Sequence, residues 1–448
     1  LLVRPGVLTR SDVTQTETRQ PHRAVTFDSH LWKSDRNADY TKRQFELISA
    51  AAEATFIKRN ERRLDLARFY FSHELFAEAK AVLDTMLADE RPTAEDPSVL
   101  VLRAVADIML GRVDAALKDL ASPLVGNQND ARLWRALAYA RQGKWPQARD
   151  AFRDVDGAIG ALPLELQRLA LTASLRALIE VGDFAAAANR LDDFKIVGTL
   201  PELQPDLSVL TGRLAEGMGR PQDALKAYRL AAGAGHRPAA AQGRLRELKL
   251  RHSIGEISKA EYITGLEALT TAWRGDETEV EALQALARLY TEDDRFRDAF
   301  HVMRVALATH PGSIVTHHIH DEAAKTFDSL FLVGKADALP AIEALSLFYD
   351  FRDLTPIGRR GDDMIRRLAE RLVSVELLDQ AAELLQYQVD NRLQGAARAQ
   401  VATRLAVIYL LNHKPDKAQA ALRATRTAEL SNDIRVPRLL IEARALSD

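Results

Sequence analysis

The most regular feature of the sequence is a pattern of small and bulky apolar residues that recurs along most of the chain. Each copy holds small apolar residues and an aromatic, then a turn, then a second aromatic or aliphatic residue and an alanine three residues later. Apolar positions at helical spacing on both sides of a turn predict pairs of antiparallel helices. The clearest copies are Leu66-Ala67-Tyr70 with Phe76 and Ala79, Leu286-Ala287-Tyr290 with Phe296 and Ala299, and Leu405-Ala406-Tyr409 with Pro415 and Ala418.

The alanine of the second helix sets the period of this repeat. It stands at positions 79, 116, 148, 187, 224, 299, 381 and 418, which gives steps of 37, 32, 39, 37, 75, 82 and 37 residues. Two steps are about twice as long as the rest, so each predicts one further, degenerate hairpin. We expect these hairpins at 244–272, broken near Gly255, and at 316–349, broken near Gly334.

Small residues and glycines give the pattern a physical basis. Antiparallel helices about 10 Å apart need small side chains where their backbones cross and bulky ones in the adjacent gaps. Glycine at the end of a first helix adopts the left-handed conformation at little cost. The predicted crossing points are Ala67, Ala287, Ala369 and Ala406; the predicted packing tyrosines are Tyr70, Tyr139, Tyr290 and Tyr409; the predicted helix ends are Gly111, Gly143, Gly182 and Gly219.

These residues resemble the tetratricopeptide repeat family, whose ~34-residue unit carries a spaced set of tryptophan, leucine, glycine, tyrosine, alanine, phenylalanine and proline. The resemblance runs from about residue 64 to the end and is best at 286–311. It implies an all-α fold, a right-handed superhelical solenoid of antiparallel helix pairs, whose first helices line a concave groove. The stretches 273–279 and 355–361 are similar to large tetratricopeptide proteins of bacterial envelopes, which implies a periplasmic location, with the cytoplasm as the alternative.

The organisation along the chain follows from where the pattern begins and breaks. Residues 1–43 have no helical period, so we expect an extended segment or the end of an upstream domain, anchored on the first hairpins by Phe27 and Trp32. The first helix is expected at 40–54. The solenoid then spans 44–333 and 334–448, and residues 438–448 indicate a first helix whose partner is missing. With leucine as first residue, we expect a processed product or a fragment.

Composition narrows the classes of function. The formal net charge is -2, so the chain lacks the basic surface that nucleic-acid binders use against phosphates. No cysteine is present, which excludes disulfides, thiolate chemistry and cysteine-ligated metals. The sequence contains no uninterrupted stretch of about 18 apolar residues, so it predicts no membrane-spanning helix. The sequence also has no nucleophile elbow, phosphate-binding glycine loop or dinucleotide fingerprint, so we expect no catalytic residues and no enzyme.

One row of arginines is the preferred candidate site. In tetratricopeptide proteins the position just after the small crossing residue faces the groove, and the resemblance places Arg68, Arg176, Arg213 and Arg288 there. Spaced guanidinium groups suit an acidic peptide or an anionic chain terminus. The alternative is that arginine is only a good helix former on a solvated face. The row is interrupted by Val105, Leu137, Glu370 and Val407, and no asparagine holds this position, which argues against a two-carboxylate clamp.

Two other clusters suggest chemistry less strongly. His317 and His320, three residues apart on one helix, could share a metal, but no second helix with ligands is identifiable, so a solvated or capping role is favoured over a metal site. Arginines and aspartates also alternate around 352–371, where we expect internal ion pairs rather than a phosphate site. We therefore expect neither a metal nor a cofactor.

Taken together, the pattern favours a non-catalytic scaffold or adaptor for protein–protein interaction. We expect it to bind a partner peptide or helix in the concave groove, with acidic groups where the partner meets the arginines. The alternative is a structural spacer that supports an adjoining functional domain in a longer envelope protein.

Overall fold

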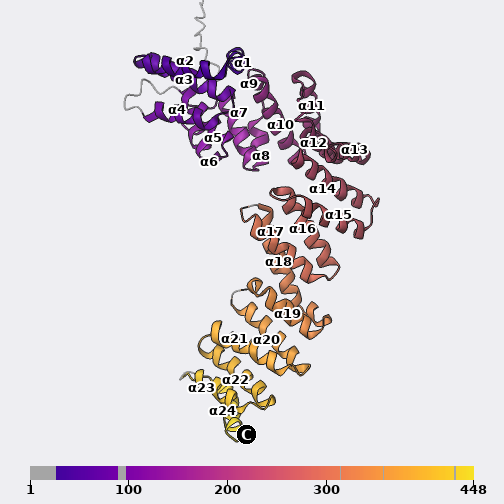
Figure 1. Ribbon diagram of the computed structural model, residues 1–448. Coiled ribbons are helices and arrows are strands. Elements are labelled where there is room, and N and C mark those ends of the chain that lie inside the picture. The colour runs from indigo at the N-terminus through magenta and orange to yellow at the C-terminus, as the bar shows by residue number, and fades with distance from the viewer. Residues whose placement is uncertain (1–26, 89–96, 313, 357, 428–429, 448) are drawn as a thin grey trace, which may run out of the picture. The chain divides into compact units, whose positions relative to one another are not determined.

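The computed structural model describes residues 27–88, 97–312, 314–356, 358–427 and 430–447. All regular structure in these ranges is helical, with 24 α-helices, two 3-10 helices and no strand (Figure 1). None of these helices is long and apolar enough to cross a membrane. The all-α prediction is confirmed.

Contacts divide the chain into two compact units, Leu1–Gly243 and Arg244–Asp448, which we call unit 1 and unit 2. The division expected at residue 334 falls inside unit 2. There the left-handed Gly334, with a φ of 97°, begins a short 3-10 helix that interrupts the helical stack. A break in helical periodicity therefore marks an irregular hairpin at this point, and the unit boundary lies elsewhere.

Before residue 237, the described part of unit 1 consists of two N-terminal helices, five hairpins and one short inserted helix. Each hairpin pairs a first helix with a second, and the two halves contact each other. The helices are α1 (Ser29–Asn37), α2 (Tyr40–Glu53), α3 (Phe56–Ser72) with α4 (Phe76–Ala88), α5 (Pro97–Met109) with α6 (Val113–Leu120), α7 (Asn129–Arg141) with α8 (Trp145–Ala151), the inserted α9 (Asp156–Gly160), α10 (Leu164–Glu180) with α11 (Phe184–Val197), and α12 (Gln204–Gly217) with α13 (Pro221–Ala232).

Unit 2 continues the same plan, and α14 (Arg237–Ser253) contains the boundary. Both predicted degenerate hairpins are present, α14 with α15 around Gly255 and α18 with α19 around Gly334. The helices that follow α14 are α15 (Lys259–Ala272), α16 (Glu277–Glu292) with α17 (Phe296–Thr309), α18 (Ile314–Phe331), η1 (Lys335–Ala338), α19 (Ala341–Asp350), η2 (Arg352–Leu354), α20 (Arg359–Ser374) with α21 (Leu378–Asn391), α22 (Gly395–Leu411) with α23 (Pro415–Ala424), and α24 (Asn432–Ser447).

The N-terminal region differs from the expectation of an extended segment through residue 43. Residues 1–26 lie outside the described residues, and helix already begins at Ser29, because Asp28 caps α1 by accepting from the backbone N–H groups of His30 and Leu31. The predicted anchors are confirmed. Phe27 is 1% exposed, and its ring lies 5.6 Å from Trp32 and 6.0 Å from Trp134, measured between ring centroids.

Small residues define the packing register, as predicted. Ala287 and Ala406, two of the crossing points, are 0% exposed. A buried alanine lets two helix backbones approach, while larger neighbours such as Tyr290 fill the space beside it. Every predicted second-helix alanine is fully buried: Ala79, Ala116, Ala148, Ala187, Ala224, Ala299, Ala381 and Ala418.

Each turn between a first and a second helix contains a residue in the left-handed backbone conformation, with a positive φ. Gly111, with a φ of 77°, is representative of the four predicted glycine helix ends, all of which have positive φ. In four other hairpins a residue with a side chain takes the same conformation at the same place, which costs free energy because its Cβ approaches the backbone carbonyl oxygen. These residues are Glu74, Asp294, Glu376 and His413.

Two arginines connect neighbouring helices through backbone carbonyl groups, a role that the sequence did not indicate. Arg135 of α7 donates to the carbonyl oxygens of Leu120 (2.5 Å) and Gly126 (2.6 Å), at and after the end of α6. Arg438 of α24 donates to the carbonyl oxygens of Ala399 and Leu422, and burial lowers its pKa. The contacts to Leu120 and Leu422 satisfy carbonyls near the ends of α6 and α23, which a helix leaves without intrahelical partners.

Candidate functional site

The first helices of the hairpins form a surface that we call the first-helix face. Within unit 1, α5 contacts α7, α7 contacts α10, and α10 contacts α12. Within unit 2, α16 contacts α18, and α18 contacts α20. This is the surface on which the sequence places its candidate arginines.

Arg176 and Arg213 are brought together on this face by one glutamate. The Arg213 Nη1 atom lies 2.8 Å from Glu180 Oε1, and the Arg176 Nε atom lies 3.5 Å from the same oxygen. The Arg176 guanidinium also lies 4.9 Å from the ring centroid of Trp145, a cation–π contact. Both guanidinium groups are therefore held in place by neighbouring helices.

The other two candidate arginines are paired elsewhere. Arg68 lies 3.9 Å from Asp65, one turn earlier on α3, measured between Nη1 and Oδ1. In unit 2, Arg288 Nε of α16 lies 3.1 Å from Glu322 Oε1 of α18. Each predicted arginine thus has a carboxylate partner, and in Arg213 and Arg288 that partner belongs to the neighbouring first helix.

Ion pairs of this kind recur between successive first helices. Arg246 of α14 lies 3.2 Å from Glu281 of α16, and Arg404 of α22 lies 2.7 Å from Glu370 of α20. The partners are separated by 35 and 34 residues, close to the length of one hairpin. A search for this spacing between arginine and glutamate could have found them in the sequence.

The first-helix face of unit 2 also contains an apolar pocket, which we call the α20–α22 pocket. Its volume is about 260 Å³, and it lies between α20, α21 and α22. Its apolar lining includes Val407 and Leu411, which are 38% and 54% exposed. The full lining is Arg366, Ala369, Glu370, Val373, Leu385, Arg404, Val407, Ile408 and Leu411.

The rim of this pocket carries paired charges. Arg404 pairs with Glu370, and Arg366 pairs with Asp363 one turn earlier. Concave, mostly apolar pockets with a few fixed polar groups are typical of ligand-binding sites. Glu370 and Val407, which interrupt the predicted arginine row, both line this pocket, and the sequence did not indicate its apolar character.

The two weaker candidate sites are the histidines of α18 and the arginine-rich stretch at 352–371. His317, His318 and His320 are exposed on α18, and within the described ranges no group of three or more histidine, aspartate or glutamate side chains could hold a metal ion. In the arginine-rich stretch, Arg360 pairs with Asp328, and Arg371 donates to the carbonyl oxygen of Asp337 at 3.1 Å. The predicted internal pairing in this stretch is confirmed.

Comparisons with known proteins agree with this architecture. Residues 130–155, which cover α7 and α8, match the tetratricopeptide repeat family model. Comparison with curated protein sequences gives no match. Similar solved structures include a Rap protein complexed with competence and sporulation factor, with 13% identity, a TM-score of 0.46, and coverage of 85% of this chain and 100% of that one.

Two further structures have lower TM-scores. The human IFIT1 dimer with m7Gppp-AAAA has 15% identity and a TM-score of 0.38, covering 94% of this chain and 88% of that one. A signal transduction ATPase with a tetratricopeptide repeat sensor from Pyrococcus horikoshii has 13% identity and a TM-score of 0.36. The similarity covers 94% of this chain and 64% of that one. Repeats of this type generally present extended binding surfaces. The match to the tetratricopeptide repeat model thus covers one hairpin, α7 with α8, and other hairpins, such as α12 with α13, share its plan of two consecutive helices in contact.

Proposed function

We propose that the chain is a non-catalytic scaffold whose first-helix face binds a partner peptide or helix, with the α20–α22 pocket as the main anchor. The observation that carries this proposal is the exposure of Val407 and Leu411 beside a concave apolar floor. Burying one leucine-sized side chain contributes about 1.5–3 kcal/mol, which is enough to make a single pocket dominate a peptide interface.

Unit 1 has a candidate contact of its own, formed by its arginines, which we propose separately from the pocket of unit 2. Trp145 and Glu180 fix the Arg176 and Arg213 guanidinium groups, so little side-chain entropy is lost when a partner carboxylate approaches. An acidic partner residue must compete there with Glu180. We therefore assign affinity mainly to the apolar pocket, and preference for an acidic partner to the arginines.

The experiment is selection of peptides from a random phage-displayed library on the full chain. Selected peptides should share an apolar residue, and Val407→Glu should weaken their binding at least about tenfold, because one buried apolar contact is lost. Val375→Glu is the control, since Val375 is 48% exposed near the end of α20 and does not line the pocket. Equal binding to wild type and Val407→Glu would overturn the proposed anchor and favour the alternative, a structural spacer.

We also propose a bacterial periplasmic location, supported by the similarity of 273–279 and 355–361 to envelope tetratricopeptide proteins. Fractionation of cells that express the native gene tests it. Recovery with periplasmic marker proteins is the expected result, and recovery with cytoplasmic markers would contradict it.

A further inference from the structure

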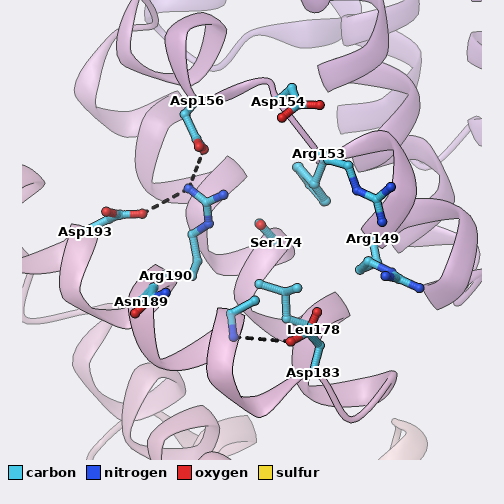
Figure 2. A pocket seen from close by; sticks show the side chains of 12 residues that line it. Arg149, Arg153, Asp154, Asp156, Ser174, Leu178, Asp183, Asn189, Arg190 and Asp193 are labelled. Atoms are coloured by element: carbon cyan, nitrogen blue, oxygen red, sulfur yellow. Dashed lines mark hydrogen bonds and ion pairs between the residues drawn. The ribbon is translucent and has the colours of Figure 1, made fainter.

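An irregular hairpin in unit 1 leaves a polar pocket that the repeat pattern does not account for. The second helix α8 has only seven residues, and the chain then turns at the left-handed Asp154, with a φ of 61°, into the inserted helix α9. The resulting pocket between α8, α10 and α11 has a volume of about 400 Å³ (Figure 2). We call it the α8–α11 pocket, and its size is that of a small-molecule site.

A buried hydroxyl lines the middle of this pocket. Ser174 is 1% exposed, and its Oγ atom has no hydrogen-bond partner within the described residues. A buried hydroxyl without a partner destabilises the fold, so such groups are normally satisfied by protein, water or ligand. Figure 2 shows Ser174 between Arg190 on one side and Arg149 with Arg153 on the other.

On one side of the pocket, an arginine is paired with two aspartates. Arg190 of α11 lies 2.7 Å from Asp156 and 3.0 Å from Asp193, measured from Nη1 to the carboxylate oxygens. The Arg190 side chain is only 14% exposed. Two carboxylates therefore neutralise the Arg190 guanidinium, while its buried Nε atom has no hydrogen-bond partner among the described residues.

The opposite side carries two further arginines. Arg149 and Arg153 lie 3.2 Å and 3.7 Å from the same oxygen of Asp150, so one carboxylate serves two guanidinium groups. The Arg153 side chain is 63% exposed and can turn toward a ligand. A pair of guanidinium groups suits a carboxylate, which accepts hydrogen bonds through both oxygens.

Two further carboxylates of the lining have no cation. Asp183 caps α11 by accepting from the backbone N–H of Ala186 at 3.3 Å, and within the described part of the chain neither Asp183 nor Asp154 forms an ion pair. The pocket thus presents guanidinium groups, a buried hydroxyl and unpaired carboxylates around one space. That arrangement complements a molecule with both a carboxylate and an ammonium group.

We propose that the α8–α11 pocket binds a free amino acid. Its carboxylate pairs with Arg149 and Arg153, its ammonium group faces Asp183 or Asp154, and Ser174 hydrogen-bonds one of the two. This ligand site is separate from the peptide-binding face proposed above and does not depend on it.

The test is isothermal titration of the full chain with each of the twenty common amino acids at millimolar concentration. At least one should bind, and its N-acetylated and decarboxylated analogues should bind at least tenfold more weakly, since each lacks one charge. Dipeptides form a second arm, because a peptide carries the same two end groups. Tighter binding of dipeptides than of every free amino acid would overturn the assignment to a free amino acid.

Two variants locate the site. Arg153→Met should weaken binding at least tenfold, whereas Lys195→Met, at a 78% exposed side chain of α11 outside the lining, should leave it unchanged. Ser174→Ala should weaken binding several-fold without loss of folding, because it removes only an unpartnered hydroxyl. Absence of heat with every amino acid, or unchanged affinity in Arg153→Met, would overturn the proposal.

Discussion

Arg213 on α12 and Glu180 on α10 stand 33 residues apart, and their side chains meet at 2.8 Å across two consecutive first helices. Arg288 and Glu322 repeat the arrangement at a separation of 34 residues. Because the spacing approximates one hairpin, each such pair links neighbouring repeats. The candidate binding arginines therefore also contribute to the stacking of the hairpins.

The first prediction concerns the energy of this link. In a double-mutant cycle of Arg213→Ala and Glu180→Ala, we expect a coupling free energy of about 1 kcal/mol, at the upper end for surface pairs because both side chains are largely buried. Urea unfolding of the wild type, both single variants and the double variant measures it. The same cycle on the exposed pair Lys195 and Asp192 should give a coupling near zero, and equal coupling in both cycles would contradict the prediction.

The second prediction tests the helix crossings. Ala287→Trp should destabilise unit 2 by about 3 kcal/mol or more, because Ala287 is 0% exposed and the added ring must displace packed neighbours. Thermal unfolding followed by circular dichroism measures the change. The control is Ala308→Trp on the exposed surface of α17, which should leave the melting temperature within about 1–2 °C of wild type. A melting temperature unaffected by Ala287→Trp would mean that the crossing lies elsewhere.

The repeat register could be predicted from sequence because it depends on local volume. A buried alanine such as Ala299 recurs with a period, and a degenerate hairpin reveals itself as a doubled step, as at Gly255. Helix α1 could not be predicted in the same way. Its position depends on contacts between distant rings, and Phe27 packs against Phe71 with 5.2 Å between the ring centroids.

The candidate sites were less predictable for the same physical reason. The sequence placed Arg213 on the first-helix face, but its partner Glu180 lies one hairpin away and is invisible to analysis of a single helix. The α8–α11 pocket arises where a short second helix is followed by an insertion, so its lining has no repeat signature. Among the steps between second-helix alanines, only the 39 residues from Ala148 to Ala187 hinted at this irregularity.

The third prediction uses the left-handed turns. Glu376→Gly should stabilise unit 2 by about 0.5–1 kcal/mol, since glycine relieves the strain of a φ of 63° that a side chain imposes. Gly182→Ala in unit 1 should have the opposite effect, with a loss of about 1 kcal/mol. Urea unfolding midpoints measure both changes. Glu376→Ala is the control for loss of the carboxylate, and a gain in stability as large as that of glycine would show that charge, not backbone conformation, is responsible.

The fourth prediction concerns Asp107, a carboxylate that is 2% exposed in α5 where the repeat family prefers tyrosine. Burial raises the pKa of Asp107, and the nearest cation, Lys80, lies 3.9 Å away and pairs more closely with Asp84. A carboxyl whose pKa is raised on folding binds more protons in the folded state, so its ionisation lowers the free energy of unfolding as the pH rises from about 4 through the raised pKa.

The substitution Asp107→Asn should remove this penalty. We expect the variant to be more stable than wild type at pH 7, by an amount on the order of 1 kcal/mol, because the buried charge is lost while the shape is kept. The difference should shrink as the pH falls toward 4, where Asp107 in the folded wild type becomes protonated. Urea unfolding of both proteins between pH 4 and 8 measures it, with Asp192→Asn, whose side chain is 65% exposed, as the control. A variant that is less stable than wild type at pH 7 would show that the ionised carboxylate, through its contact with Lys80, stabilises the fold.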